Sequence, residues 1–137
     1  MKKIVFEIFA TLVPLAALPL RLAVGTAFVV HGYPKLSGES AKQTRDFMKT
    51  IGVPPSVTSL TALLEFFGGI AIILGFLTPI AGLLIALEML GTTILSKNKL
   101  QKKYVLGYEL DIAYLAGALS LVFLGAGPFS IDAILGL

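Results

Sequence analysis

Several ionisable side chains lie inside stretches of the sequence that are otherwise long and apolar. Placing a charge in hydrocarbon costs at least about 2.5 to 3.5 kcal/mol, so each such residue needs a structural or chemical reason. Glu65 and Glu88 fall near the middle of their stretches, and two neighbouring desolvated carboxyls can hold and exchange a proton, which suits proton or quinol chemistry. The ionisable residues in apolar stretches are Arg21, His31, Glu65, Glu88, Glu109 and Asp111.

A structural role competes with this chemistry for both central carboxyls. Arg21 could neutralise Glu65 across a helix interface, and Thr92 could hydrogen-bond to Glu88 because it follows one helical turn later. We favour a functional role for Glu65, and both interpretations of Glu88 stay open.

The remaining ionisable residues lie near the inner ends of their stretches. Lys35 follows His31 by four residues, and we expect its ammonium to reach outward to the lipid head groups. As the only histidine, His31 cannot supply both ligands of a bis-histidine haem or the ligands of a multi-histidine copper site. If His31 takes part in redox chemistry, we expect it to donate a proton or a hydrogen bond to a quinone. Glu109 and Asp111 are two residues apart and project from different helical faces.

Cysteine usage and charge exclude several classes of function. The sequence has no cysteine, which rules out disulfides, thiolate metal ligands and dithiol exchange. We therefore expect no haem or metal to be bound by this chain alone. The formal net charge of +3 sits in polar segments beside the apolar stretches, where it indicates contact with lipid and membrane topology and not nucleic-acid binding.

The elements that must position these residues are membrane-spanning helices. The chain of 137 residues is 56% hydrophobic and 14% charged, with a mean hydropathy of +0.91, and its apolar runs reach the roughly 20 residues that a spanning helix needs. We predict an all-α, integral membrane four-helix bundle in a single domain, residues 1–137. The expected spans run from about Pro14 or Leu18 to His31, from Ser56 to Gly75, from Thr78 to near Ser96, and from Val105 or Tyr108 to just before Gly125.

Local signals refine the ends and contacts of these helices. Ser40-Ala-Lys-Gln43 has the form of a capping box and predicts a short amphipathic interfacial helix in the first loop. Thr78 is the expected cap of the third span, with Pro79 in its first turn. Small residues spaced by four, Gly82 with Ala86 and Ala113 with Gly117, favour close helix packing.

Topology follows from the distribution of lysine and arginine. The segments 33–55 and 96–107 carry eight of these residues, whereas the N-terminus carries Lys2 and Lys3. The positive-inside rule places both loops in the cytoplasm and both termini outside a plasma membrane. The N-terminal stretch has features of a signal peptide, but prolines and Arg21 interrupt it, so we expect it to be retained.

The order and spacing of several motifs resemble the DoxX family over residues from about Arg21 to Asp132. The motifs are Arg21 with Gly25, Phe28 and Gly32-Tyr-Pro-Lys-Leu36, then Gly52-Val-Pro54, Glu65-Phe-Phe-Gly-Gly69, Leu74-Gly-Phe-Leu-Thr78, Gly107-Tyr-Glu109 and Gly125-Ala-Gly-Pro-Phe-Ser-Ile-Asp132. The resemblance implies a four-span membrane protein associated with quinone-linked electron transfer. The family takes its name from a subunit of an archaeal terminal quinol oxidase, and related DoxD proteins belong to a thiosulfate to quinone oxidoreductase.

The resemblance also ranks the polar residues. It implies that Arg21, Glu65, Glu109 and Asp132 are polar positions of the family type, whereas Glu88 and His31 fall outside the matched motifs. Asp132 has two interpretations. It is either a carboxylate at the start of a short terminal helix capped by Ser130, or a partner of Arg21 that holds the terminal segment as a lid over a cavity.

We therefore predict a membrane subunit of a quinone-linked oxidoreductase, of the terminal quinol oxidase or the sulfur and thiosulfate oxidation type. In this prediction Arg21 and Glu65 shape a pocket for a quinone or quinol head group, and the partners are the lipid bilayer and further subunits or a second copy. The residues predicted to contact the head group are Arg21, His31, Glu65, Glu88, Glu109 and Asp132. Two alternatives stay open, namely a permeation component whose path is lined by Glu65 and Glu88, and a structural anchor or assembly factor.

Overall fold

The computed structural model describes residues 2–137, and its regular structure is helical throughout this range. Met1, which the predicted domain includes, and the side chains of Lys2, Lys3 and Val5 lie outside what is described. The elements are α1 (Lys2–Leu12), the 3-10 turn η1 (Val13–Leu15), α2 (Ala17–Leu36), α3 (Gly38–Thr50), α4 (Pro55–Leu63), the π-helical η2 (Leu64–Gly68), α5 (Gly69–Leu74), α6 (Thr78–Asn98), η3 (Tyr104–Tyr108), α7 (Glu109–Leu124) and α8 (Ile131–Leu135).

The predicted all-α membrane architecture is confirmed, with one span in a bent form. Three helical stretches are long and apolar enough to cross a membrane: Pro55–Leu74, Thr78–Asn98 and Tyr104–Leu124. A fourth crossing is available if Phe6–Leu15 and Ala17–Leu36, which meet at an angle of 40°, form one broken span. Proline in η1 explains the bend, because it lacks the amide proton of a continuous helix.

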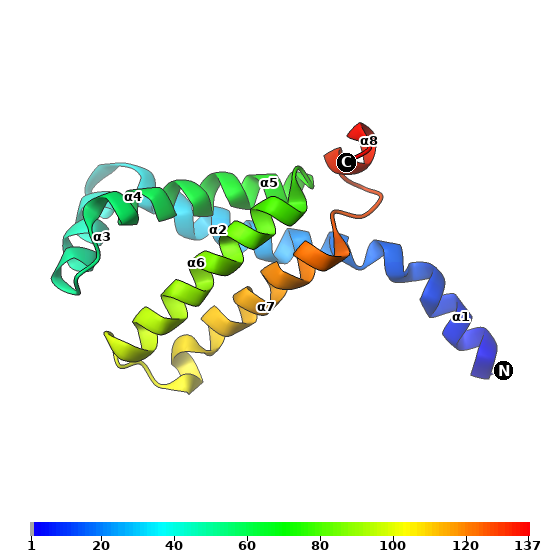
Figure 1. Cartoon of the computed structure of the whole chain (residues 1–137), viewed down its shortest axis with the longest axis horizontal. Helices are drawn as coiled ribbons and strands as arrows, with labels where there is room; N and C mark the ends of the chain where they lie inside the picture. Colours follow the sequence, from blue (N-terminus) through cyan, green and yellow to red (C-terminus); the bar gives the residue numbers. More distant parts are fainter. Residues whose placement is uncertain (1) are drawn as a thin grey trace.

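The spans form two pairs that meet at one end and separate at the other (Figure 1). α2 lies beside the continuous helix made by α4, η2 and α5, and α6 lies beside α7. The pairs are close where the α5–α6 turn and α8 lie, and they diverge toward α3 and η3. α1 extends away from the bundle.

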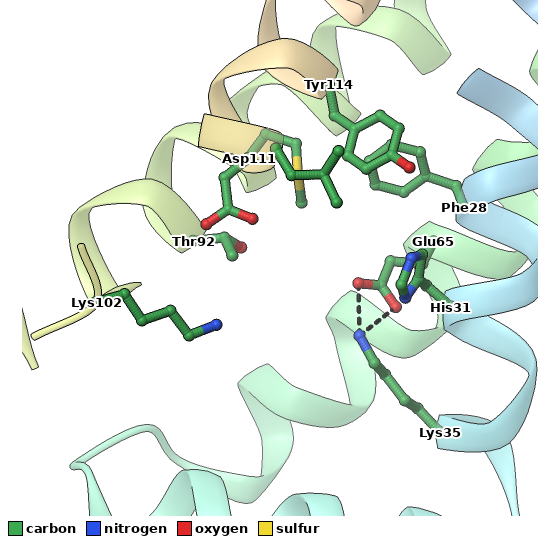
Figure 2. Close-up of a pocket in the computed structure, with 10 residues that line it drawn as sticks. Phe28, His31, Lys35, Glu65, Thr92, Lys102, Asp111 and Tyr114 are labelled. Carbon is green, nitrogen blue, oxygen red and sulfur yellow. Dashed lines mark hydrogen bonds and ion pairs between the residues drawn. The ribbon is translucent and has the colours of Figure 1, made fainter. Parts of the chain in front are cut away.

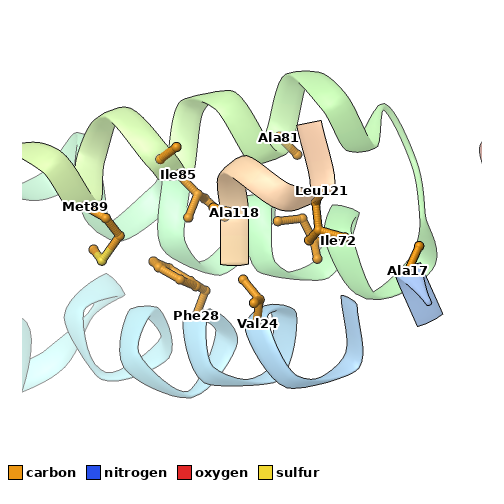
Figure 3. Close-up of a cluster of buried hydrophobic side chains, with 10 residues drawn as sticks. Ala17, Val24, Phe28, Ile72, Ala81, Ile85, Met89, Ala118 and Leu121 are labelled. Carbon is orange, nitrogen blue, oxygen red and sulfur yellow. The ribbon is translucent and has the colours of Figure 1, made fainter. Parts of the chain in front are cut away.

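The core fills the region where the two pairs meet (Figure 3). Ile72, Ile85, Ala118 and Leu121 are fully buried there, and Phe28 and Met89 mark the end of the core nearest to the divergence. Large apolar side chains also cover the outside of the bundle, including Leu60, Phe67 and Phe123, the last of which is 84% exposed. In a membrane-spanning bundle this exposed apolar surface faces lipid.

Glycines allow α2 and the α4–η2–α5 helix to touch along their backbones. A Cβ on Gly25 would lie 2.8 Å from the Gly69 carbonyl oxygen, and one on Gly32 would lie 2.6 Å from the Phe66 nitrogen. No larger residue fits at these positions unless the helices move apart. The predicted contact through Gly82 also occurs, since its Cβ would lie 3.0 Å from the Ala118 carbonyl oxygen on α7.

Two predicted helix boundaries are wrong. α2 continues past His31 to Leu36, although Pro34 lies in its last turn. The interfacial helix α3 begins at Gly38 and not at Ser40, because Ser37 takes an extended conformation and Gly38 a positive φ that lets the helix restart immediately.

The start of α6 also differs from its prediction. Thr78 is its first helical residue and does not cap it, while the preceding Leu77 lies in the left-handed region with φ of 46°. The cap comes instead from the distant Asp132, as described below.

Candidate functional site

A cavity of about 260 Å³ lies between the two helix pairs where they diverge (Figure 2). One wall comes from α2 and η2, which contribute Phe28, His31, Lys35 and Glu65. The facing wall comes from α6, α7 and the loop between them, and it contributes Met89, Thr92, Lys102, Leu110, Asp111 and Tyr114.

An ion pair dominates the wall formed by α2 and η2. The Lys35 Nζ donates hydrogen bonds of 2.7 Å to both carboxylate oxygens of Glu65. Glu65 is 5% exposed as a whole, and the Lys35 side chain retains 29% of its exposure. Glu65 lies in the π-helical segment η2, a distortion that is frequent at functional sites because it re-aims side chains. Gly32 lets this segment approach α2 closely enough for the pair to form.

This pair corrects two expectations. Lys35 does not reach out to the head groups, because the extra turn and a half of α2 keeps it on the helix, directed toward Glu65. Arg21 does not neutralise Glu65, because all its hydrogen bonds within residues 2–137 go to backbone carbonyls.

Glu88 lies next to the Glu65 carboxyl but is not itself one of the residues lining the cavity. Its carboxyl interacts with the carboxyl of Glu65 and with the charge of Lys35. Its Oε2 is buried and has no hydrogen-bond partner among the described residues, and the predicted bond to Thr92 does not form. Two carboxyls and one ammonium are thus grouped inside the bundle.

Polar groups on the facing wall are also held in place. The Ser96 hydroxyl, on a residue that is 2% exposed, donates a hydrogen bond of 2.9 Å to Asp111 Oδ2 and ties α6 to α7. Tyr114 packs edge-on against Phe28 with ring centroids 5.6 Å apart. Glu109 was predicted to contact the head group but does not line this cavity, because its Oε1 accepts a bond of 2.8 Å from the Leu106 amide in η3.

Arg21 lies at the other end of the bundle and is 2% exposed. Its guanidinium donates to the carbonyls of Ile72 at 2.9 Å and Ile73 at 2.6 Å, at the end of α5. It also donates to the carbonyls of Ala126 at 2.7 Å and Phe129 at 2.8 Å, in the segment before α8. One side chain therefore fastens the C-terminal segment across the end of the bundle.

Asp132 completes this fastening without bonding to Arg21. Its two carboxylate oxygens accept bonds of 2.6 Å from the Leu77 amide and 2.9 Å from the Thr78 amide, so it caps α6. Its own amide donates to the Gly75 carbonyl oxygen at 2.8 Å. Ser130 caps α8 as predicted, through a bond from the Ala133 amide. Of the two interpretations of Asp132, the carboxylate at the start of the terminal helix is the one observed, and in place of a pair with Arg21 there are two separate sets of backbone bonds.

The six predicted site residues fall into three groups. His31 and Glu65 line the cavity with Glu88 beside them, Arg21 and Asp132 lie at the opposite end, and Glu109 at the start of α7 bonds to η3. Four residues that line the cavity were not predicted from the sequence as site residues: Lys35, Lys102, Asp111 and Tyr114. A signal existed for Lys35, which lies one turn after His31, and for Asp111, which is ionisable within an apolar stretch.

The cavity offers both donors and acceptors between apolar walls. Ammonium and hydroxyl groups of Lys35, Lys102 and Tyr114 can donate, whereas the carboxylates of Glu65 and Asp111 can accept. Such a set suits a small ring with oxygen substituents that are carbonyls in one state and hydroxyls in another.

Comparisons with known proteins place the chain in a family. A family model described as DoxX matches residues 16–98. The chain is 32% identical over 116 residues to inner membrane protein YqjF of Escherichia coli (strain K12), covering 84% of this chain and 88% of that protein. It is 30% identical over 118 residues to the Bacillus subtilis (strain 168) protein named "Putative oxidoreductase CatD", covering 86% and 85%.

A further relative is also named as an inner membrane protein. Inner membrane protein YphA of Escherichia coli (strain K12) is 26% identical over 127 residues, covering 87% of this chain and 89% of that protein. No solved structure matches the chain. The apolar spans of this chain and the names of these relatives together indicate a multi-pass protein of the cell membrane, in contact with the lipid bilayer. The matches over most of its length establish that this chain is a member of the DoxX family.

Proposed function

We propose that this chain is a membrane subunit of a quinone-linked oxidoreductase, and that the cavity between its helix pairs binds the quinone head group. The observation that carries the proposal is the Glu65–Lys35 pair, placed with Asp111 and Tyr114 around a small cavity at the inner end of the spans. The relative named as an oxidoreductase adds support at the level of the reaction class.

The size of the cavity fits one substituted ring. Its volume of about 260 Å³ is just below the roughly 300 to 1,000 Å³ of pockets for drug-sized ligands. Phe28 and Met89 provide apolar surface for the faces of a ring, and the polar groups are arranged around them. A longer apolar chain on the ligand must therefore extend outside the cavity.

The polar residues would bind and orient the ring in either of its states. A quinone bound here would supply two-electron chemistry coupled to protons. Lys35, Lys102 or Tyr114 would donate hydrogen bonds to carbonyl oxygens, and Glu65 or Asp111 would accept them from hydroxyls. Glu65 would hold or release a proton at the ring oxygen, and Lys35 would stabilise the charged form of Glu65. The neighbouring carboxyl of Glu88 would exchange this proton with Glu65. Electrons would come from a partner subunit.

The packing argues against a permeation path through a single copy. The core of fully buried residues blocks the way between the cavity and the far side, and the Arg21 and Asp132 bonds close that side. We also propose the topology that places segments 33–55 and 96–107, and hence the mouth of the cavity, in the cytoplasm.

The test is isolation of the tagged protein from its native membranes in mild detergent, with mass-spectrometric identification of co-purifying polypeptides. The same preparation is assayed for reduction or oxidation of a decyl-substituted benzoquinone, using wild type, Glu65→Gln and the exposed control Glu39→Gln. We expect a stoichiometric redox subunit, with activity lost in Glu65→Gln and kept in the control. Recovery of this chain alone, or full activity in an assembled Glu65→Gln complex, would contradict the proposal.

A further inference from the structure

The interface between α2 and α7, here called the seam, is closely packed in the half that contains Tyr114, Gly117 and Leu121. Tyr114, Gly117 and Leu121 follow one another along the face of α7 that meets α2. A Cβ on Gly117 would lie 3.0 Å from Val24 Cγ2, Leu121 is fully buried, and Tyr114 packs on Phe28. The Phe28–Tyr114 contact is the innermost point of this close packing.

The same seam is open one turn further in. Leu110 precedes Tyr114 by four residues on α7, and His31 follows Phe28 by three on α2, so these two residues continue the seam. Both line the cavity, yet Leu110 is 52% exposed and His31 is exposed. The cavity therefore reaches the surface of the bundle between α2 and α7, beside the two rings.

The opposite side of the cavity is walled by direct helix packing. η2 lies on α6, and a Cβ on Gly68 would be 3.3 Å from the fully buried Ile85. The Glu65 and Glu88 carboxyls meet across the same contact. A ligand has no comparable opening on that side.

The opening lies at the level of the inner membrane boundary. Leu110 is the second residue of α7, and His31 lies in the last two turns of α2. The rim is apolar on the α7 side, where Leu110 lines the cavity and stays about half exposed. The basic groups Lys35 and Lys102 lie at the end of the cavity toward the loops, so the seam faces lipid while the loop end faces water.

We propose that the ligand enters the cavity sideways from the inner lipid leaflet through the α2–α7 seam, at His31 and Leu110. The ligand is then a membrane-dissolved amphiphile whose apolar chain stays in the seam while its polar head lies beside Glu65 and Lys35. This inference rests on the proposed function, because the head group is taken to be a quinone ring. It adds the requirement for a lipid tail and the route of access.

The absence of cysteine from the sequence allows a reversible block of the seam. Leu110→Cys is modified with a bulky methanethiosulfonate reagent and later restored with dithiothreitol. The matched control is Ile112→Cys, which lies on the other side of the same helix turn. Binding to the purified, lipid-reconstituted protein is measured with two probes that share one ring: dimethoxymethylbenzoquinone without a side chain, and its decyl derivative.

The expected result separates the two probes. Modification at residue 110 should slow binding of the decyl compound by about tenfold or more, because its chain has lost its path, and dithiothreitol should restore the rate. The ring without a side chain should bind as before through the loop end, and modification at residue 112 should change neither probe. Equal binding of the decyl compound before and after modification at residue 110 would overturn the lateral route. Loss of both probes would also overturn it, because residue 110 would then fill the head-group site itself.

The proposed function fails in a different way. If neither probe binds the unmodified protein, the quinone assignment is wrong and the seam has no such ligand to admit.

Discussion

At the residue scale, the partly exposed Lys35 and the buried Arg21 have different tasks. Lys35 faces a carboxylate at the cavity, whereas Arg21 satisfies four backbone carbonyls at the opposite end. The five donors of a guanidinium in a fixed plane suit the second task, and a single ammonium on a flexible stem suits the first. Their chemistry follows from these partners and not from their shared charge.

We predict that Glu65 and Lys35 are energetically coupled. Glu65→Gln leaves the Lys35 ammonium partly buried without its counter-charge, which should cost about 1 to 3 kcal/mol, less than a fully buried pair because Lys35 is partly exposed. Lys35→Met alone should cost a similar amount. The double variant should recover part of the loss, as measured by thermal unfolding in detergent. Strictly additive losses would mean that the pair does not form in the membrane protein.

Arg21 should be a stability residue and not a ligand of the cavity. Arg21→Met removes the side-chain donor of four backbone carbonyls, of which only that of Ile72 keeps a bond from another amide, that of Gly75, and it should destabilise the protein by about 3 kcal/mol or more. The stability of Arg21→Lys should lie between that of the wild type and that of Arg21→Met, since the three donors of a lysine cannot reach all four acceptors. The measurement is the unfolding midpoint together with proteolysis of the C-terminal segment. A stable Arg21→Met protein with intact protection but lost quinone binding would contradict this role.

At the element scale, the number and approximate limits of the spans could be predicted because apolar length is written directly in the sequence. The π-helical turn at Glu65 could not be predicted, since no residue in Leu64–Gly68 specifies it. The Arg21 and Asp132 contacts were also hidden, because they join segments more than 50 residues apart. Lys35 was misplaced because helix α2 was predicted to end too early.

The backbone contact between α2 and η2 gives a prediction at this scale. Gly32→Ala places a Cβ 2.6 Å from the Phe66 nitrogen, so the helices must separate, at a cost of about 1 to 3 kcal/mol. Gly91→Ala is the matched control, because a Cβ there meets no atom within 4 Å. Unfolding midpoints should drop for the first variant and stay level or rise for the second. Equal midpoints would show that the close approach is not required.

At the scale of the whole molecule, the polar cavity lies at one end of the bundle and the Arg21 and Asp132 bonds lie at the other. The end with the polar cavity lies beside α3 and the loop rich in lysine. A ligand site of this form is reached from one face of the membrane or from the adjoining leaflet. The orientation of the chain therefore decides which compartment exchanges protons with the site.

Topology can be tested with single cysteines, since the natural chain has none. Lys99→Cys, in the loop before η3, should react with a membrane-impermeant maleimide only after the cells are broken. Ile134→Cys, on the 82% exposed residue of α8, should react in intact spheroplasts. The reverse pattern would place the cavity mouth outside the cell.

The most direct test of the central claim is photolabelling with an azido-substituted quinone in native membranes, followed by mass-spectrometric mapping of the modified residues. We expect labels on residues 28–35 and 110–114, competition by unlabelled decyl quinone, and loss of labelling in Glu65→Gln but not in Glu39→Gln. Labelling that persists in Glu65→Gln, resists competition, or spreads over lipid-facing residues such as Phe67 would contradict a quinone site in this cavity.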